Sequence, residues 1–134
     1  MNETETSIRF ALFPVGTEHY ALAVEDIVEL VGLHNQEGEA GYIRYKKRRI
    51  PLYNLGQLLG IKAGSDFLII VRGKESSYGI LVPEPPEFRS IGKNQILPLP
   101  DLISAKGKKL LKGVIVIGDQ LYGILAPDHL RSDE

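Results

Sequence analysis

The sequence contains no cysteine, which excludes a disulfide framework, a thiolate nucleophile and a cysteine-ligated metal site. It also lacks an apolar run long enough to cross a bilayer, so we expect no membrane insertion. Neither sign of charge prevails, because 16 lysines and arginines stand against 17 aspartates and glutamates. A net charge of -1 gives no domain-wide field for gripping nucleic acid or an anionic membrane.

Residues 1–7 are polar and acidic, and they lack the basic start and apolar body of a signal peptide. They predict a disordered tail and a cytoplasmic location. Residues 8–134 have the length of one compact domain, and the hydrophobic content of 43% is enough to build a core.

The residues that usually carry catalysis are sparse and scattered. His19, His34 and His129 lie far apart and lack metal-ligand spacing. No glycine-rich phosphate loop follows an expected strand, and no serine sits in a nucleophile-elbow pattern. The sequence therefore predicts a protein that is not an enzyme and that has no cofactor and no metal.

The stretch Gly41–Ile61 organises the chain. Residues 42–45 and 50–53 are expected strands, joined by a tight basic turn at residues 46–49. Pro51 has no N–H to donate, so its strand should lie at a sheet edge or carry a bulge there. A short helix should follow, with one buried stripe and a left-handed glycine cap, made by Leu55, Leu58, Leu59 and Gly60.

Short apolar runs between turn residues predict many further strands, at residues 8–13, 20–24, 27–31, 67–71, 78–82, 88–91, 96–97, 114–117 and 121–126. The continuous run Phe67–Val71 should be buried on both faces, and a helical turn at Glu25 and Asp26 should precede residues 27–31. With so little helix, the pattern predicts an all-β fold of two small β-barrels side by side, with a single sandwich as the alternative.

The two predicted barrels divide the chain near residue 65. The first should hold residues 13–64 and the second residues 66–126. The N-terminal strand and the C-terminal tail would be free to cross between them.

A cluster of cations with interleaved tyrosines suggests one binding function. The cluster consists of Arg44, Lys46, Lys47, Arg48 and Arg49, with Tyr42 and Tyr45 among them. A small barrel with such a turn could bind nucleic acid by phosphate contacts and base stacking. We favour a solvated hairpin turn, because the acidic balance elsewhere removes any domain-wide field.

Glu29 interrupts the aliphatic residues of the strand at 27–31. An acid in such a strand is either an edge residue in water or half of an ion pair, and such pairs are weak unless partly desolvated. The nearest cations in the sequence are those of the basic turn, so Lys46 and Arg44 are the expected partners.

From about Phe10 to Leu130 the chain resembles the CheW-like chemotaxis adaptor family. The family's first hairpin and its valine/isoleucine-x-glutamate-isoleucine strand resemble residues 20–30, with Glu29 at the glutamate. Its signature of glycine-valine-x-asparagine-leucine-arginine-glycine, proline, aspartate-leucine and leucine-glycine resembles residues 41–60. Its later strands resemble residues 79–83 and 111–130. The order and spacing of these motifs together carry the resemblance.

This sequence departs from the family pattern at several surface positions. Arg44-Tyr45-Lys46-Lys47 stands where the family has asparagine-leucine-arginine-glycine, so lysine replaces the arginine and the glycine is lost. The family's aspartate before leucine is Asn54, and its valine-aspartate is Val82-Pro83. A core this well kept with altered surface motifs suggests that the fold is retained and the partner surface has moved.

The resemblance implies two five-stranded SH3-like barrels, no catalysis and a role as a signalling scaffold. Family members bridge chemoreceptor helical tips to the regulatory domain of a histidine kinase. Receptors dock in an apolar groove between the barrels and the kinase docks at barrel ends. On this sequence the partner surface is expected at Ile27, Val31 and Ile43, with Glu29 and Lys46 at its rim. The oligomeric state stays open.

Overall fold

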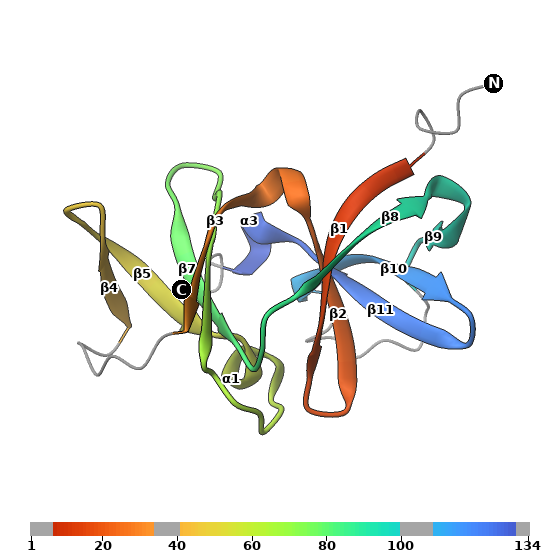
Figure 1. Cartoon of the computed structure of the whole chain (residues 1–134), viewed down its shortest axis with the longest axis horizontal. Helices are drawn as coiled ribbons and strands as arrows, with labels where there is room; N and C mark the ends of the chain where they lie inside the picture. Colours follow the sequence, from red (N-terminus) through yellow and green to blue (C-terminus); the bar gives the residue numbers. More distant parts are fainter. Residues whose placement is uncertain (1–6, 34–40, 100–108, 131–134) are drawn as a thin grey trace.

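A computed structural model of the protein describes residues 7–33, 41–99 and 109–130 (Figure 1). The tail expected at residues 1–7 lies outside the described residues, except for Ser7, which begins the first strand. Two β-sheets lie side by side, the five-stranded one at the left of the view and the six-stranded one at the right. The predicted β fold with two side-by-side units is thus confirmed, although one sheet has six strands.

The six-stranded sheet has the order β8-β1-β2-β11-β10-β9. Neighbouring strands pair antiparallel except β2 and β11, which run parallel. A 3-10 turn, η3 (Lys93–Gln95), connects β8 to β9. The strands are β1 (Ser7–Val15), β2 (Glu18–Ala23), β8 (Glu87–Gly92), β9 (Ile96–Leu97), β10 (Leu111–Ile117) and β11 (Gln120–Leu125).

The five-stranded sheet has the order β3-β6-β7-β5-β4, so β3 and β4 are its edges. The pairs are antiparallel except β5 and β7, which run parallel. Its strands are β3 (Ile27–Leu33), β4 (Tyr42–Tyr45), β5 (Arg48–Asn54), β6 (Phe67–Val71) and β7 (Tyr78–Val82).

The two sheets share the largest core cluster. Phe13, Tyr20 and Leu22 of the six-stranded sheet pack in it with Ile69 and Tyr78 of the five-stranded sheet. Smaller clusters fill the six-stranded sheet around Ile115 and the five-stranded sheet around Ile70. Fully burying such a side chain contributes about 1.5–3 kcal/mol, so the shared cluster stabilises each sheet and their contact together.

Strand β6 is buried along its whole length, as its continuous apolar run predicts. Alternate side chains of a strand point to opposite faces. Phe67, Ile69 and Val71 therefore enter the shared cluster, while Leu68 and Ile70 enter the smaller cluster of the five-stranded sheet.

The division of the chain at residue 65 is wrong. Strand β2 pairs with β1 and β11 in the six-stranded sheet, whereas β6 and β7 complete the sheet of β3, β4 and β5. The reason is local, because the tight turn at Gly16, with φ of 64°, folds β2 back onto β1. β1 does lie with the later strands, as expected, but β2 goes with it.

The chain crosses between the sheets through short connections. The 3-10 turn η2 (Val24–Asp26) leads from β2 to β3, and it confirms the predicted helical turn. After β11, the helix α3 (Pro127–Leu130) returns to the five-stranded sheet. There the buried Tyr78 hydroxyl donates a hydrogen bond of 2.6 Å to the Pro127 carbonyl oxygen. This bond joins the C-terminal segment to β7.

Pro51 lies where β5 changes partners. Residues 48–51 pair with β4, and residues 52–54 pair with β7. The missing N–H of Pro51 therefore removes no hydrogen bond to β7. This register agrees with the prediction that Pro51 lies where its strand has a free edge.

Helix α1 (Leu55–Leu59) follows directly. The Asn54 side chain accepts a hydrogen bond from the Gln57 N–H at 3.2 Å and caps the helix start. Gly60 ends the helix in the left-handed conformation, with φ of 74°, as predicted.

Candidate functional site

The candidate site lies on the two edge strands of the five-stranded sheet. Strand β3 pairs with β6 through an irregular register, with shifts between Ile27 and Glu29 and between Leu30 and Gly32. Val28 and Val31 are the residues left without a partner at these two bulges. Bulges redirect side chains and mark places where a strand departs from simple alternation.

The bulges decide which side chains of β3 reach the surface. Ile27 and Leu30 are half-buried and pack against the shared core cluster. Val28 and Val31 are 39% and 43% exposed. Ile27 was predicted as part of the partner surface, and it is only half-exposed there because strict alternation does not hold across the bulges. Val31 is exposed as predicted, and Val28 joins it.

Ile43 also lies inside the protein. It is only 9% exposed and packs with Ile50, Leu68 and Ile70 in the smaller cluster of the five-stranded sheet. Its place in the predicted partner surface is therefore wrong in the isolated chain. The outward side of β4 instead presents Tyr42, which is 43% exposed.

Glu29 bonds to the opposite edge strand. Its carboxylate accepts a hydrogen bond from the hydroxyl of Tyr45, the last residue of β4. This bond raises the pKa of Tyr45 above its ordinary value, because it stabilises the protonated hydroxyl. The hydrogen bond therefore links the two edges of the sheet, consistent with the small-barrel character of the fold.

The expected ion pair between Glu29 and Lys46 or Arg44 is not formed among the described residues. Lys46 lies in the turn beyond the end of β4, and its ammonium sits 5.5 Å from the centre of the Tyr45 ring. Tyr45 stands between Lys46 and Glu29 in this arrangement. Both charged residues are exposed, as their predicted rim positions require.

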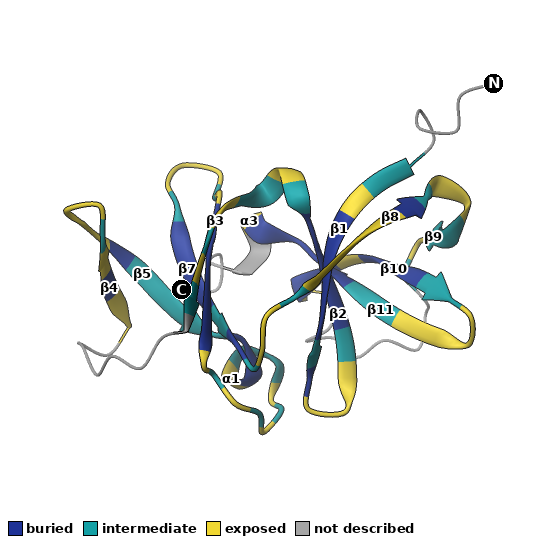
Figure 2. Ribbon diagram, viewed as in Figure 1, coloured by how far each residue is buried: buried dark blue, intermediate teal, exposed yellow. Residues whose placement is uncertain are grey.

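The basic hairpin, defined here as residues 44–49, projects at the left end of the molecule (Figure 2). Lys46 and Lys47 form its two-residue turn, with φ of 50° and 69°. A turn with positive φ at both central residues matches the right-handed twist of a hairpin, but glycine and asparagine favour it and lysine does not. Lys47 occupies the position at which the family pattern has glycine.

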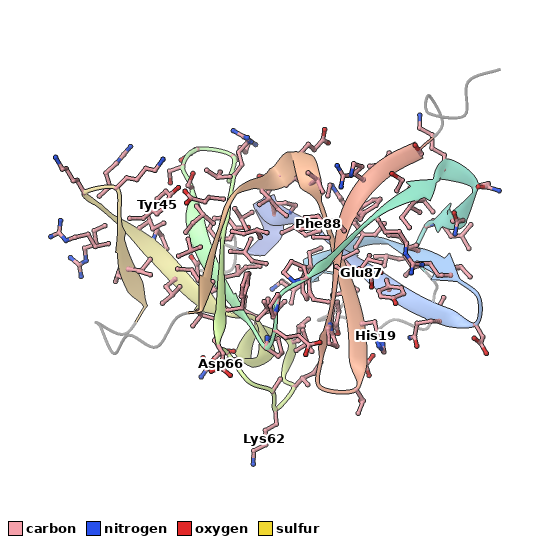
Figure 3. The ribbon with its side chains drawn as sticks, viewed as in Figure 1. His19, Tyr45, Lys62, Asp66, Glu87 and Phe88 are labelled. Atoms are coloured by element: carbon pink, nitrogen blue, oxygen red, sulfur yellow. The ribbon has the colours of Figure 1, made fainter. Side chains whose placement is uncertain are left out.

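The cations of this hairpin are spread around its surface. Arg44, Lys46, Lys47, Arg48 and Arg49 are all exposed. The guanidinium of Arg49 lies 4.3 Å from the centre of the Tyr42 ring, which orders the arginine by a cation–π contact. In Figure 3 nitrogen-tipped side chains fan out from this end of the protein.

This arrangement suits protein contacts more than it suits chemistry. Across residues 7–33, 41–99 and 109–130, no group of three His, Cys, Asp or Glu side chains could hold a metal ion. None of the helices in that part of the chain is long and apolar enough to span a bilayer. Exposed valines beside a carboxylate and a cationic hairpin form an apolar surface with a charged rim.

Sequence reasoning missed three residues of this site. Val28 was not among the residues predicted for the partner surface, because the bulges that turn it outward leave no mark in the sequence pattern. Tyr42 and Tyr45 were noted only as possible stacking platforms. A signal for Tyr45 was present, since a tyrosine at a strand end has the reach to meet a carboxylate on a neighbouring edge.

Comparison with known proteins identifies the family. The model of the CheW-like domain family matches residues 9–134. Among solved structures, the chain is similar to the scaffolding protein TtCheW from Thermoanaerobacter tengcongensis, with a TM-score of 0.79 and 23% sequence identity. That similarity covers 93% of this chain and 92% of the other, and it confirms the fold. A search of curated proteins found no match.

Proposed function

Because the chain belongs to the CheW-like domain family, we propose that it is a signalling adaptor that couples chemoreceptor-type sensors to a histidine kinase. The adaptor has no catalytic role and no cofactor, and it works in the cytoplasm. Its partners are chemoreceptor-like helical tips and the regulatory domain of the kinase.

The observation that carries this proposal is the exposed part of the two edge strands. Val28 and Val31 stand outward at bulges, and Tyr42 stands outward on β4. The fold alone does not require exposed aliphatics, so two of them on one sheet edge support a surface that another protein covers. We name this set the edge-strand surface, comprising Val28, Glu29, Val31, Tyr42 and Tyr45.

Glu29 gives the edge-strand surface its charged rim. Its carboxylate is exposed, although it holds the Tyr45 hydroxyl. A rim charge governs the association rate and its dependence on salt more than it governs final affinity. In an adaptor, such a charge would favour association with partners of complementary charge.

The proposal is tested by binding the purified chain to the regulatory domain of a histidine kinase and to a chemoreceptor tip fragment, both encoded in the same genome. Val28→Ser combined with Val31→Ser should weaken binding to at least one partner by about tenfold, because each buried valine contributes roughly 1 kcal/mol or more. Glu29→Lys should slow association several-fold at low salt, on the order expected for a rim charge.

Glu75→Lys is the matched control, since Glu75 is also exposed but lies in the loop between β6 and β7. Melting temperatures of all variants establish that each is folded. Wild-type binding in both edge-strand variants would overturn the proposed surface. Failure of the unaltered chain to bind either partner would overturn the adaptor role itself.

A further inference from the structure

We propose that the basic hairpin, residues 44–49, is a docking element for an acidic segment of a partner protein. The inference rests on the proposed adaptor function only in assuming that this chain has a partner protein. Besides Lys46, which stands where the family pattern has its single arginine, it rests on cations that are this chain's own. These are Arg44, Lys47 and Arg48.

The charge of the hairpin is unlike that of the rest of the chain. It holds five of the 16 lysines and arginines and none of the 17 acids, so the remaining residues carry 11 positive and 17 negative charges, a net of -6. Arg44, Lys47 and Arg48 make no ion pair with any of the residues that the structure describes. A cationic tip on an anionic body selects a partner that is acidic over a short distance.

The turn retains lysine where lysine is unfavourable. Lys46 and Lys47 both have positive φ, a conformation that costs an L-residue free energy and that glycine adopts freely. Backbone strain of this kind, when observed, points to a function of the residue that is kept there. The two ammonium groups at the hairpin tip are the gain that offsets the strain.

The surroundings favour carboxylates over a nucleic acid strand. The Arg49 guanidinium lies over the Tyr42 ring and the Lys46 ammonium lies over the Tyr45 ring, so a base would have to displace a cation to stack on that face of either ring. A long phosphate backbone would also run from the hairpin onto the anionic body. A short acidic segment can contact the hairpin alone and avoids that repulsion.

The hairpin's size defines the probe. A four-residue strand is roughly 13 Å long, so a labelled oligoglutamate of about ten residues can span the hairpin. Its binding to the full chain is measured by fluorescence anisotropy at about 10 mM and about 0.15 M salt, where the Debye length falls from about 30 Å to about 8 Å. An oligoglutamine and an oligothymidylate of the same length are measured in parallel.

The test variant is Lys47→Glu with Arg48→Glu, and the matched control is Lys62→Glu with Lys93→Glu. Lys62 and Lys93 are exposed and lie outside the hairpin, and Lys62 projects from the lower edge of the protein in Figure 3. Reversing the two hairpin charges should weaken oligoglutamate binding by about tenfold at low salt. The control variant should keep most of the wild-type affinity, since exposed ion pairs are individually weak and act locally.

Lys47→Gly separates binding from folding. Glycine relieves the positive φ, so the melting temperature should rise by about 3 °C. Loss of the ammonium should nevertheless weaken oligoglutamate binding. A residue with a purely structural role would not move stability and binding in opposite directions.

Three results would overturn the proposal. One is the absence of oligoglutamate binding at low salt, and another is an equal loss of binding in the control variant. The third is tighter binding of oligothymidylate than of oligoglutamate at about 0.15 M salt, which would favour a nucleic acid ligand. None of these measurements uses a kinase or a receptor. A negative result would therefore overturn the docking element without deciding whether the chain is an adaptor.

Discussion

The hydrogen bond between Tyr78 and Pro127 is expected to hold the C-terminal segment on the five-stranded sheet. Tyr78 is fully buried, and its hydroxyl lies 2.6 Å from the Pro127 carbonyl oxygen. Tyr78→Phe keeps the ring and its edge-to-face packing on Tyr53 but removes this donor. A buried acceptor that loses its partner costs about 1–3 kcal/mol.

The corresponding change in melting temperature can be measured by circular dichroism. For a chain of this length each kcal/mol shifts the midpoint by roughly 3–5 °C, so Tyr78→Phe should melt several degrees lower. Urea unfolding should show a lower midpoint with an unchanged slope, because the compactness of the folded state is unaffected.

Tyr53→Phe is the matched control. Tyr53 is half-buried and packs in the same aromatic pair, but its hydroxyl has no hydrogen bond within the described part of the chain. Its removal should change stability by less than about 0.5 kcal/mol. Equal stability of Tyr78→Phe and Tyr53→Phe would show that this bond does not hold the C-terminal segment on the sheet.

Further predictions concern the turn, the sheet junction and a tight loop. Lys46→Asn should raise the free energy of unfolding in urea by about 1 kcal/mol, because asparagine tolerates positive φ. Burial raises the pKa of Asp26 above its ordinary 3.8, so the folded state loses stability as pH rises through and above that value. Asp26→Asn should therefore raise the melting temperature at neutral pH, and the gain should vanish once the pH falls below 3.8. Gly73→Ala should lower the unfolding free energy in urea by about 1–3 kcal/mol, since its added Cβ would collide with the Ser76 carbonyl oxygen.

The sequence predicted the elements whose signals are local. Asn54 and Gly60 enclose α1, and both act through hydrogen bonds or backbone angles within one turn. The apolar run of β6 is buried on both faces because it lies between two core clusters. Such features depend on a few neighbouring residues, so a single sequence contains them.

Long-range pairing could not be predicted in the same way. The parallel pairs of β2 with β11 and β5 with β7 join segments far apart in the chain, and no turn chemistry specifies them. The boundary between the two units was therefore misplaced, because β2 follows its hairpin partner β1 into the six-stranded sheet and pairs there with the distant β11. Hydrophobic content tells which strands are buried, but it does not tell in which sheet.

The candidate site was predicted in part because its residues depend on register. Glu29, Val31 and Lys46 are exposed as expected, whereas Ile43 is buried in a core and Ile27 is half-buried against another. Each of the two bulges in β3 shifts the register by one residue. Such a shift turns inward-facing side chains outward and outward-facing side chains inward. The Glu29 partner was missed because Tyr45 reaches it across the sheet edges.

The proposed adaptor function requires that this chain binds two proteins at once. The most direct measurement is size-exclusion chromatography with light scattering on the chain mixed with a kinase regulatory domain and a chemoreceptor tip fragment. We expect one species whose mass includes all three components, and the double variant Val28→Ser and Val31→Ser should form less of that complex. Elution of the unaltered chain alone, with neither partner bound at micromolar concentration (on the order of a weak signalling contact), would contradict the adaptor function.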